Sequence, residues 1–242
     1  MIDFYRIKDR IEEWLRYPQP TRQQKQLLGM YTDVIDTDFT ALRLASEESA
    51  GYIQANMRAI PNFATDYDLH KWVATTQVSD QGWVLEFGVA TGRTLNQFAT
   101  WLPRKRVIGF DGFEGLPEDW TSRMRKGFFA RSNLPRVRKN CELVVGWFDQ
   151  TLPGFKKTKI QNDPIALLHI DCDLYSSTVT VLDTLKDNIV SGTVIVFDEY
   201  INYPGWQLDE FRAWQEHCKK YGVKYEYIGY VSRHQKVAVR VL

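Results

Sequence analysis

The sequence has few cysteines and no long apolar run, and each absence excludes a class of protein. Only three of its 242 residues are cysteine, and none belongs to a CxxC pair. A disulfide framework is therefore not expected, and Cys141, Cys172 and Cys218 are interpreted as small core residues. No run of about 18 apolar residues occurs, which excludes a membrane-spanning helix. Since the first 14 residues mix acids and bases and do not resemble a signal peptide, we expect a cytoplasmic protein without a membrane partner.

An excess of charge of either sign is also missing. The formal net charge is +1, from 31 Lys and Arg against 30 Asp and Glu, so the overall charge indicates no particular partner. Hydrophobic residues make up 44% of the chain and charged residues 25%. These are ordinary values for a globular protein and exclude extended disorder.

Residues 1–80 show no β pattern and read as a series of helices. Phe4, Ile7 and Ile11 share one helix face, and further helices are expected at residues 21–32, at residues 38–58 and around Trp72. We therefore divide the chain into a helical N-terminal segment, 1–80, and a second domain, 81–242. Our hypothesis is that the helical segment forms a lid and a subunit contact, so that the protein is a homo-oligomer.

From Trp83 onward, short apolar runs alternate with helix-period segments, which is typical of βαβ units. The last two strands are separated by too few residues for a parallel crossover, so they must be antiparallel. The pattern predicts an α/β fold of the Rossmann-like, doubly wound kind, with a seven-stranded, mostly parallel sheet and one antiparallel strand. A helix is expected at 206–221, closed by Gly222. The predicted strands are 83–87, 106–110, 142–145, 165–170, 193–197, 224–228 and 236–241.

A glycine-containing loop follows the first of these strands. Gly88 and Gly92 lie four residues apart between a strand and a helix, where a backbone can approach a ligand closely. Asp111 ends the next strand, which is where a carboxylate can accept hydrogen bonds from ribose hydroxyls. The three-glycine fingerprint of NAD enzymes is missing, and Glu86 before the loop favours S-adenosylmethionine instead. The alternative is a plain strand-to-helix turn.

Four carboxylates follow two of the central strands. Asp171 and Asp173 come after one strand, and the Asp198–Glu199 pair comes after another. In a parallel sheet these strand ends meet at one edge, so the acids should converge and repel one another unless a cation lies among them. Oxygen ligands suit Mg²⁺ or another divalent cation. The alternative is structural, with Asp171 capping the following helix. His169 is interpreted as a hydrogen-bonded residue and not as a catalytic one.

Four motifs occur in an order that resembles the macrocin O-methyltransferase family of S-adenosylmethionine-dependent methyltransferases. They are LEFGVATG at 85–92, FDGFEGLP at 110–117, GWFDQTLP at 146–153 and HIDCDLYSST at 169–178. The resemblance covers about residues 83–200. It implies methyl transfer to a hydroxyl oxygen of a sugar or glycosylated natural product, with a divalent metal, usually magnesium.

The resemblance also implies roles for individual residues. Asp171, Asp198 and Glu199 fall on the family's metal positions, and Asp173 falls on its proposed base, so Asp173 and Asp171 are the expected catalytic residues. The usual pair after the later strand is Asp-Asp, whereas here the second ligand is Glu199. The cofactor contacts expected in full are Glu86, Gly88, Gly92, Thr94, Asp111, Gly112, Phe113, Gly146, Trp147 and Asp171.

Residues 121–140 contain seven Lys and Arg residues and no acid. One interpretation is a solvated surface. The other is a cationic flap, anchored by Phe128 and Phe129, that favours an anionic acceptor such as a nucleotide-linked sugar. Nucleic acid is not expected as a partner, because the aromatic residues are too few and too clustered for a stacking track.

Two other functions remain open from the sequence. A catechol-type small-molecule O-methyltransferase would use the same metal chemistry on an aromatic diol. A non-catalytic protein could keep the cofactor-binding fold without turnover, although the intact acids Asp171, Asp173 and Asp198 argue against it.

Overall fold

The computed structural model describes residues 36–242. The chain divides into two compact units, residues 1–44 and residues 45–242, and the larger unit contains the sheet described below. The first two predicted helices, which include Phe4 to Ile11 and residues 21–32, lie outside the described residues. The third corresponds to helix α3, Thr37–Asn56, whose residues from Ala45 onward belong to the larger unit.

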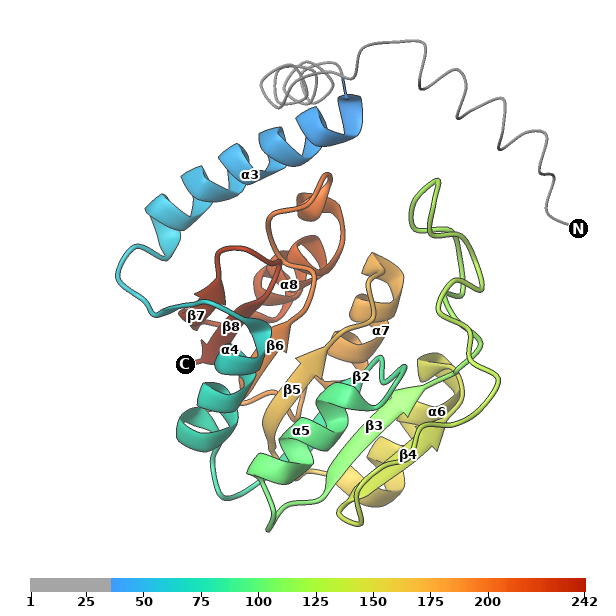
Figure 1. The fold of residues 1–242 in the computed structure, drawn as a ribbon. Helices are drawn as coiled ribbons and strands as arrows, with labels where there is room; N and C mark the ends of the chain where they lie inside the picture. The colour runs from blue at the N-terminus through green and yellow to red at the C-terminus, as the bar shows by residue number, and fades with distance from the viewer. Residues whose placement is uncertain (1–35) are drawn as a thin grey trace, which may run out of the picture. The chain divides into compact units, whose positions relative to one another are not determined.

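The larger unit is built on an eight-stranded sheet with the order β1-β7-β8-β6-β5-β2-β3-β4 (Figure 1). Among the described strands only β8 runs antiparallel, against β6 on one side and β7 on the other. The Rossmann-like fold and the single antiparallel strand are thus confirmed. The bounds are β1 Asn62–Phe63, β2 Trp83–Phe87, β3 Val107–Asp111, β4 Cys141–Val145, β5 Ile165–Ile170, β6 Val194–Phe197, β7 Tyr225–Val231 and β8 Val237–Val241.

Two details of the predicted sheet and helices were wrong. The sheet has an eighth strand, β1, which pairs in parallel with β7 and lies inside the segment expected to be wholly helical. The helix expected at 206–221 is interrupted at Asp209, where φ is −105° and ψ is −117°. A short 3₁₀ turn, Trp206–Leu208, precedes the break and α8, Glu210–Tyr221, follows it. Gly222 ends α8 in the left-handed conformation, as predicted.

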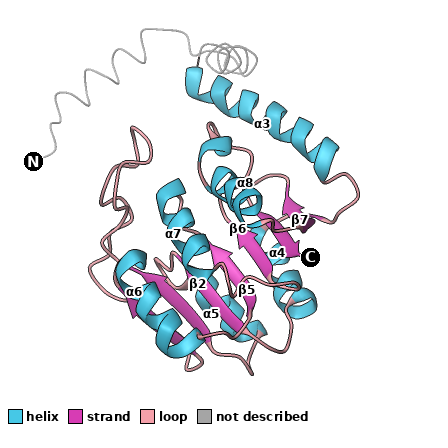
Figure 2. Cartoon of the chain, turned by 180° about the vertical axis from the view of Figure 1, so that it is seen from behind, coloured by secondary structure: helices cyan, strands magenta, loops and turns pink. Residues whose placement is uncertain are grey.

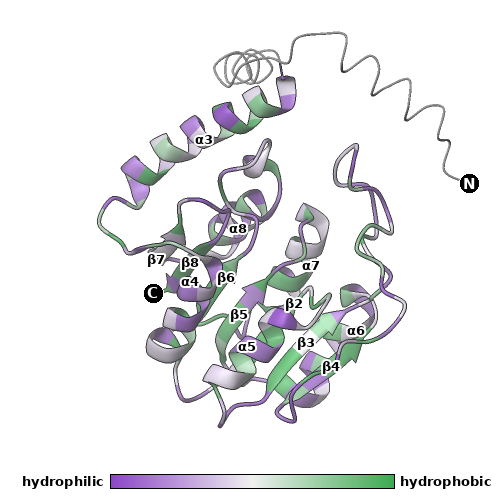
Figure 3. Cartoon of the chain, viewed as in Figure 1, coloured by the Kyte–Doolittle hydropathy of each residue, from purple (hydrophilic) through white to green (hydrophobic). Residues whose placement is uncertain are grey.

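Helices cover both faces of the sheet because its central strands are apolar on both sides (Figures 2 and 3). Every residue of β5 is buried. Leu85 and Phe87 face a core that contains residues of α6, α7 and α8, while Val84 faces a second core with α4 and α5. The helices not yet given are α4 Asp66–Trp72, α5 Arg93–Trp101, α6 Phe148–Phe155 and α7 Tyr175–Leu185, with π-helical turns at Val73–Gln77 and Lys156–Ile160.

Residues 45–80 are part of the sheet's core, which differs from the expected division at residue 80. Leu69 and Val73 are fully buried in the core beneath α4 and α5. The Tyr52 hydroxyl lies 2.5 Å from that of Tyr227 on β7. Helix α4 contacts both β7 and β1, so this part of the segment packs on the sheet. The lid and subunit contact expected of residues 1–80 stay a prediction.

Within residues 36–242, no helix combines the length and the apolar character needed to cross a bilayer.

Candidate active site

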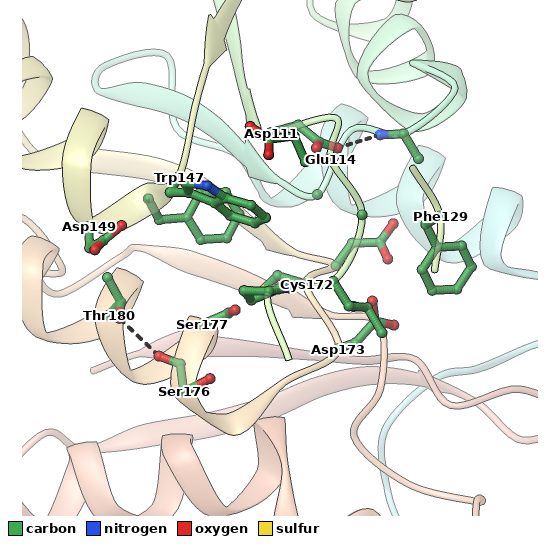
Figure 4. Close-up of a pocket in the computed structure, with 18 of the residues that line it drawn as sticks. Asp111, Glu114, Phe129, Trp147, Asp149, Cys172, Asp173, Ser176, Ser177 and Thr180 are labelled. Carbon is green, nitrogen blue, oxygen red and sulfur yellow. Dashed lines mark hydrogen bonds between the residues drawn. The ribbon is translucent and has the colours of Figure 1, made fainter. Parts of the chain in front are cut away.

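A cavity of about 790 Å³ lies at the carboxyl ends of the parallel strands (Figure 4). This is the edge where ligands bind in open α/β sheets, because the strand ends and the loops behind them diverge there. Residues from all four sequence motifs contribute to its lining. The predicted site residues that line it are Gly88, Asp111, Gly112, Trp147, Asp171, Asp173, Asp198 and Glu199.

The floor of the cavity is backbone packed against backbone. At Gly88, where φ is +91°, an added Cβ would lie only 1.6 Å from the Asp171 carbonyl oxygen. The Asp171 N–H donates to the Phe87 carbonyl at 2.8 Å and extends the β2–β5 pairing into the loop. Only glycine fits this junction, since any side chain would force the two strand ends apart. The close contact brings the glycine loop and the first acid of the 171–173 pair into one site.

Asp111 organises the glycine loop. One of its carboxylate oxygens accepts hydrogen bonds from the N–H groups of Val89 and Ala90, both at 2.8 Å. Its other oxygen accepts from the Phe113 N–H at 2.6 Å. Asp111 lines the cavity as expected for a ribose-binding acid. The structure adds that the same carboxylate holds the loop in shape, because each oxygen already binds backbone N–H groups.

Trp147 and Phe148 form an aromatic wall beside the glycine loop. A Cβ at Gly112 would lie 3.3 Å from the Trp147 ring, so this glycine lets the indole lie against the backbone. In Figure 4, Trp147 and Phe129 stand on opposite sides of the cavity. A flat ring at this position can stack on an adenine.

Five predicted cofactor contacts do not line the cavity: Glu86, Gly92, Thr94, Phe113 and Gly146. Three of these five residues support parts of the chain that line the cavity. Gly92 starts helix α5 with a φ of +73°, the Gly146 N–H donates to the Asp111 carbonyl at 3.0 Å, and Phe113 donates to the Asp111 side chain. Their role in this structure is to shape the site from behind.

Glu86 differs most from its expected role as a contact for the methionine end of the cofactor. It is only 1% exposed, and its carboxylate lies 3.2 Å from Nδ1 of His169. Since side chains alternate along a strand, Glu86 faces the opposite side of the sheet from Leu85 and Phe87 and lies under α4 and α5. From there it does not reach the cavity.

The acids at the ends of β5 and β6 converge as predicted. Asp171, Asp198 and Glu199 each contribute one carboxylate oxygen, and these three oxygens lie within 4.8 Å of one another. Burial and the repulsion of neighbouring carboxylates raise the pKa values of Asp171 and Glu199 well above their usual range. Burial and the charges of Asp198 and Asp209 raise the pKa of Asp173 to about 7. Protons can relieve this repulsion, and a bound cation would do the same.

Sequence reasoning missed Glu210, another buried acid, in the first turn of α8. Its side chain is fully buried, and one of its oxygens accepts from the Glu199 N–H at 3.0 Å. The other Glu210 oxygen and one oxygen of Glu199 have no hydrogen-bond partner among the described residues. Burial, above all, raises the pKa of Glu210. Orphaned carboxylate oxygens of this kind fit a site for a hard cation.

Asp198 differs from the other acids because two cations accompany it. Lys236 Nζ lies 2.6 Å from one Asp198 oxygen, and His169 Nε2 lies 3.8 Å from the other. Burial alone would raise the pKa of Asp198, but the nearby His169 and the Lys236 charge outweigh it and hold this pKa well below its usual range. Asp198 is therefore a fixed anion.

His169 is fully buried and does not line the cavity. Although burial lowers its pKa, the neighbouring carboxylates of Asp198 and Glu86 raise it to about 10. The neighbouring His70 ring packs edge-on at 5.0 Å, and burial, together with the His169 charge, lowers the pKa of His70 to about 3. The atoms of His70, His169 and Asp198 also lie within 4.8 Å of one another. We assign no metal there, because Glu86 and Asp198 are already balanced by His169 and Lys236.

The segment from Glu114 to Phe129 forms one wall of the cavity. It is tied to α7 by a hydrogen bond from Ser176 to Glu118 at 2.5 Å. A second bond, from Trp120 Nε1 to Asp209 at 2.9 Å, ties it to the break before α8. Within the basic stretch 121–140, Lys126 and Phe129 line the cavity.

The later part of the basic stretch is engaged elsewhere. Asn96 on α5 donates to the Arg136 carbonyl at 3.0 Å and accepts from the Arg138 N–H at 2.8 Å. Neither arginine lines the cavity. Of these three basic residues in the proposed cationic flap, Lys126 lines the cavity and the two arginines do not.

Comparison with known proteins agrees with this geometry. Residues 85–200 match a family model described as a methyltransferase domain. Over 116 residues the chain is 31% identical to the 8-demethyl-8-(2,3-dimethoxy-alpha-L-rhamnosyl)-tetracenomycin-C 4'-O-methyltransferase of Streptomyces olivaceus, covering 40% of this chain and 42% of that one. Over 124 residues it is 31% identical to the demethyldecarbamoylnovobiocin O-methyltransferase of Streptomyces niveus, covering 43% and 45%. The match thus spans less than half the length of these curated relatives.

Solved structures show the same fold at lower identity. The calicheamicin methyltransferase CalS11 is 21% identical, with a TM-score of 0.56 over 93% of this chain and 95% of that one. The O-methyltransferase NovP is 18% identical, with a TM-score of 0.54 over 82% and 97%. Residues 85–200 of this chain are thus similar to a methyltransferase domain, and the solved structures share its fold.

Proposed function

We propose that this protein transfers the methyl group of S-adenosylmethionine to a hydroxyl oxygen of a small molecule, with a divalent cation, and that the acceptor is a sugar or a glycosylated natural product. One observation carries the proposal: a glycine loop with an aromatic wall and a cluster of acids open into the same cavity. The acceptor class is supported by the relatives, whose names describe a rhamnosyl tetracenomycin and a novobiocin precursor.

The cofactor would lie over the glycine loop. Gly88 and Gly112 line the cavity with backbone alone, Trp147 would offer a stacking face for the adenine, and Asp111 would bind the ribose. Bound there, S-adenosylmethionine supplies an electrophilic methyl group on a sulfonium. The task of the protein is to hold the acceptor oxygen in line with that methyl group and to exclude water.

The residues of the acidic cluster fit a divalent cation such as Mg²⁺. Asp171, Asp198 and Glu199 offer oxygen ligands from the ends of two adjacent strands, and the buried Glu199 oxygen without a partner among the described residues fits a cation ligand. Such an ion lowers the pKa of a hydroxyl that binds it and fixes its direction. Glu199 stands where the family that the sequence resembles has aspartate, so this ligand would reach one methylene further.

Asp173 would remove the proton from the acceptor hydroxyl. It lines the cavity two residues after Asp171, and its backbone has a φ of +62°, a strained conformation that aims the side chain into the site. A carboxylate with a pKa near 7 is poised to accept a proton at neutral pH. Asp171 would help to hold the cation, together with Asp198 and Glu199.

Thermal and chemical unfolding with ligands test the cofactor. S-adenosylhomocysteine at 100 times its Kd should raise the free energy of unfolding by about 2.7 kcal/mol. NADH is the matched control and should have no effect. Stabilisation by NADH and not by S-adenosylhomocysteine would contradict the proposal.

Metal dependence is tested by turnover with sugar-bearing and catechol acceptors, with and without EDTA. Activity should disappear in EDTA and return with Mg²⁺, and Asp198→Ala should lose most of it while the Kd for S-adenosylhomocysteine barely changes. Full turnover in excess EDTA would exclude the metal. A preference for catechols over sugars would exclude the proposed acceptor class, and binding without turnover on any acceptor would favour a non-catalytic protein.

A further inference from the structure

Lys236 is a lysine in a place where lysines are rare. It directly precedes β8 and is only 7% exposed, and its Nζ lies 2.6 Å from an Asp198 oxygen. The contact follows from the sheet register. Val237 of β8 pairs with Phe197 of the antiparallel strand β6, so Lys236, just before β8, lies beside Asp198, just after β6. Burying an ammonium group costs solvation free energy, so a buried lysine is stable only where nearby anions offset that cost.

The charges around Lys236 show what it balances. Lys236 and His169 contact Asp198, and His169 also contacts Glu86, in one connected network. The neighbouring acids Asp171, Asp173, Glu199 and Glu210 have no lysine or arginine within ion-pair distance in the described part of the chain. Among the described lysines and arginines, Lys236 is thus the one that pairs with an acid of the cluster, and that acid is Asp198. Contact with Asp198, and the field of Glu199, raise the pKa of Lys236 against the effect of burial.

We propose that Lys236 is an internal counter-ion for Asp198, which takes part of the charge role of the divalent cation when none is bound and thereby weakens divalent-cation binding. This rests on the proposed function, because it assumes the cation site of Asp171, Asp198 and Glu199. A divalent cation that binds Asp198 must share this carboxylate with the ammonium, and two like charges on one carboxylate repel each other strongly in a low-dielectric interior.

A different role for Lys236 would have the opposite effect on cation binding. If the lysine mainly held Asp198 in a geometry suited to a metal, its removal would weaken the metal, as the loss of a supporting hydrogen bond usually does, by about 10- to 100-fold. The structure favours the counter-ion, because Asp198 has a second support in His169 and the other ligands of the cluster carry no cation of their own.

The experiment measures the Kd for Mn²⁺ by titration calorimetry and by electron paramagnetic resonance. Wild type, Lys236→Met and Lys236→Arg are compared, all saturated with S-adenosylhomocysteine. Lys236→Met should bind Mn²⁺ at least about tenfold more tightly than wild type, and Lys236→Arg should stay within about threefold because it keeps the charge. Mn²⁺ should also raise the Tm of Lys236→Met more than that of wild type.

Lys156→Met is the matched control. Lys156 pairs with Asp187 at 3.0 Å, outside the cavity lining, so its removal should leave Mn²⁺ affinity unchanged. If Lys236→Met does not fold, Lys236→Gln answers the same question, because its amide can donate to Asp198 without a charge.

Unchanged or weaker Mn²⁺ binding by the Met and Gln variants would overturn the counter-ion role. Binding of S-adenosylhomocysteine is measured first in every variant. Failure of all folded proteins, wild type included, to bind it would contradict the proposed function itself, so the two failures are distinguishable.

Discussion

The two halves of the cavity are stabilised in opposite ways. In the cofactor half, polar groups find their partners within the chain, as when the two Asp111 oxygens accept three backbone N–H groups. In the acidic half, Glu199 and Glu210 each keep a buried oxygen without a partner in the described residues. Backbone contacts preform the first half, whereas the second depends on charge balance from protons, from Lys236 and from the proposed cation.

This difference implies that substitutions act differently in the two halves. A change in the cofactor half should alter shape, and so should affect folding and cofactor affinity together. A change in the acidic half should alter charge, and so should affect catalysis and cation binding at constant fold. The predictions below test this separation, from the largest expected effect to the smallest.

Asp173→Asn should lower kcat by about 10²- to 10⁴-fold, because the amide cannot accept the proton of the acceptor hydroxyl. The Kd values for S-adenosylhomocysteine and Mn²⁺ should change little, since the fold and the three proposed ligands remain. Steady-state kinetics and calorimetry measure the two quantities. Asp183→Asn, at an exposed ion pair on α7, is the control. An unchanged kcat in Asp173→Asn would dismiss this residue as the base.

Gly88→Ala should lower the free energy of unfolding by about 3 kcal/mol and weaken S-adenosylhomocysteine as well. The added methyl group would meet the Asp171 carbonyl in a positive-φ conformation. Gly154→Ala is the matched control, because it lies in α6 with open space around its Cβ position. Urea unfolding measures both. Equal stability of the two variants would show that the floor of the cavity is not rigid.

Trp147→Ala should weaken S-adenosylhomocysteine by about 1–3 kcal/mol, the usual contribution of an aromatic ring stacked on a base. Trp147→Phe keeps a flat ring against Gly112 and should lose less. Fluorescence or calorimetric titration distinguishes the two. If both variants bind as wild type does, the adenine does not lie against this wall.

Lys126→Glu should give the smallest effect, a rise of about threefold in KM for an anionic acceptor at low ionic strength that disappears in high salt. The matched control is the double variant Arg136→Glu and Arg138→Glu. Both arginines belong to the basic stretch 121–140, but neither lines the cavity. A larger rise in KM in the arginine double variant would show that the acceptor binds closer to Arg136 and Arg138 than to Lys126.

Much of the cavity could be predicted because its causes are local. The apolar run at 165–170 forms a strand buried along its whole length, and a glycine after a strand marks a close backbone approach, as found at Gly88. The convergence of Asp171 with Asp198 and Glu199 follows from one rule, that neighbouring parallel strands end at the same edge. These features need no knowledge of distant partners.

Other features depend on segments that meet only in the folded chain. Strand β1 is two residues long and exists through its pairing with β7. Glu86 was expected to contact the cofactor, but in the folded chain it lies beside His169, 83 residues away in the sequence. Lys236 reaches Asp198 across 38 residues through the register of β8 on β6. Local pattern encodes strands and turns, whereas the partner of a buried charge is chosen by long-range pairing and packing, which only the tertiary structure specifies.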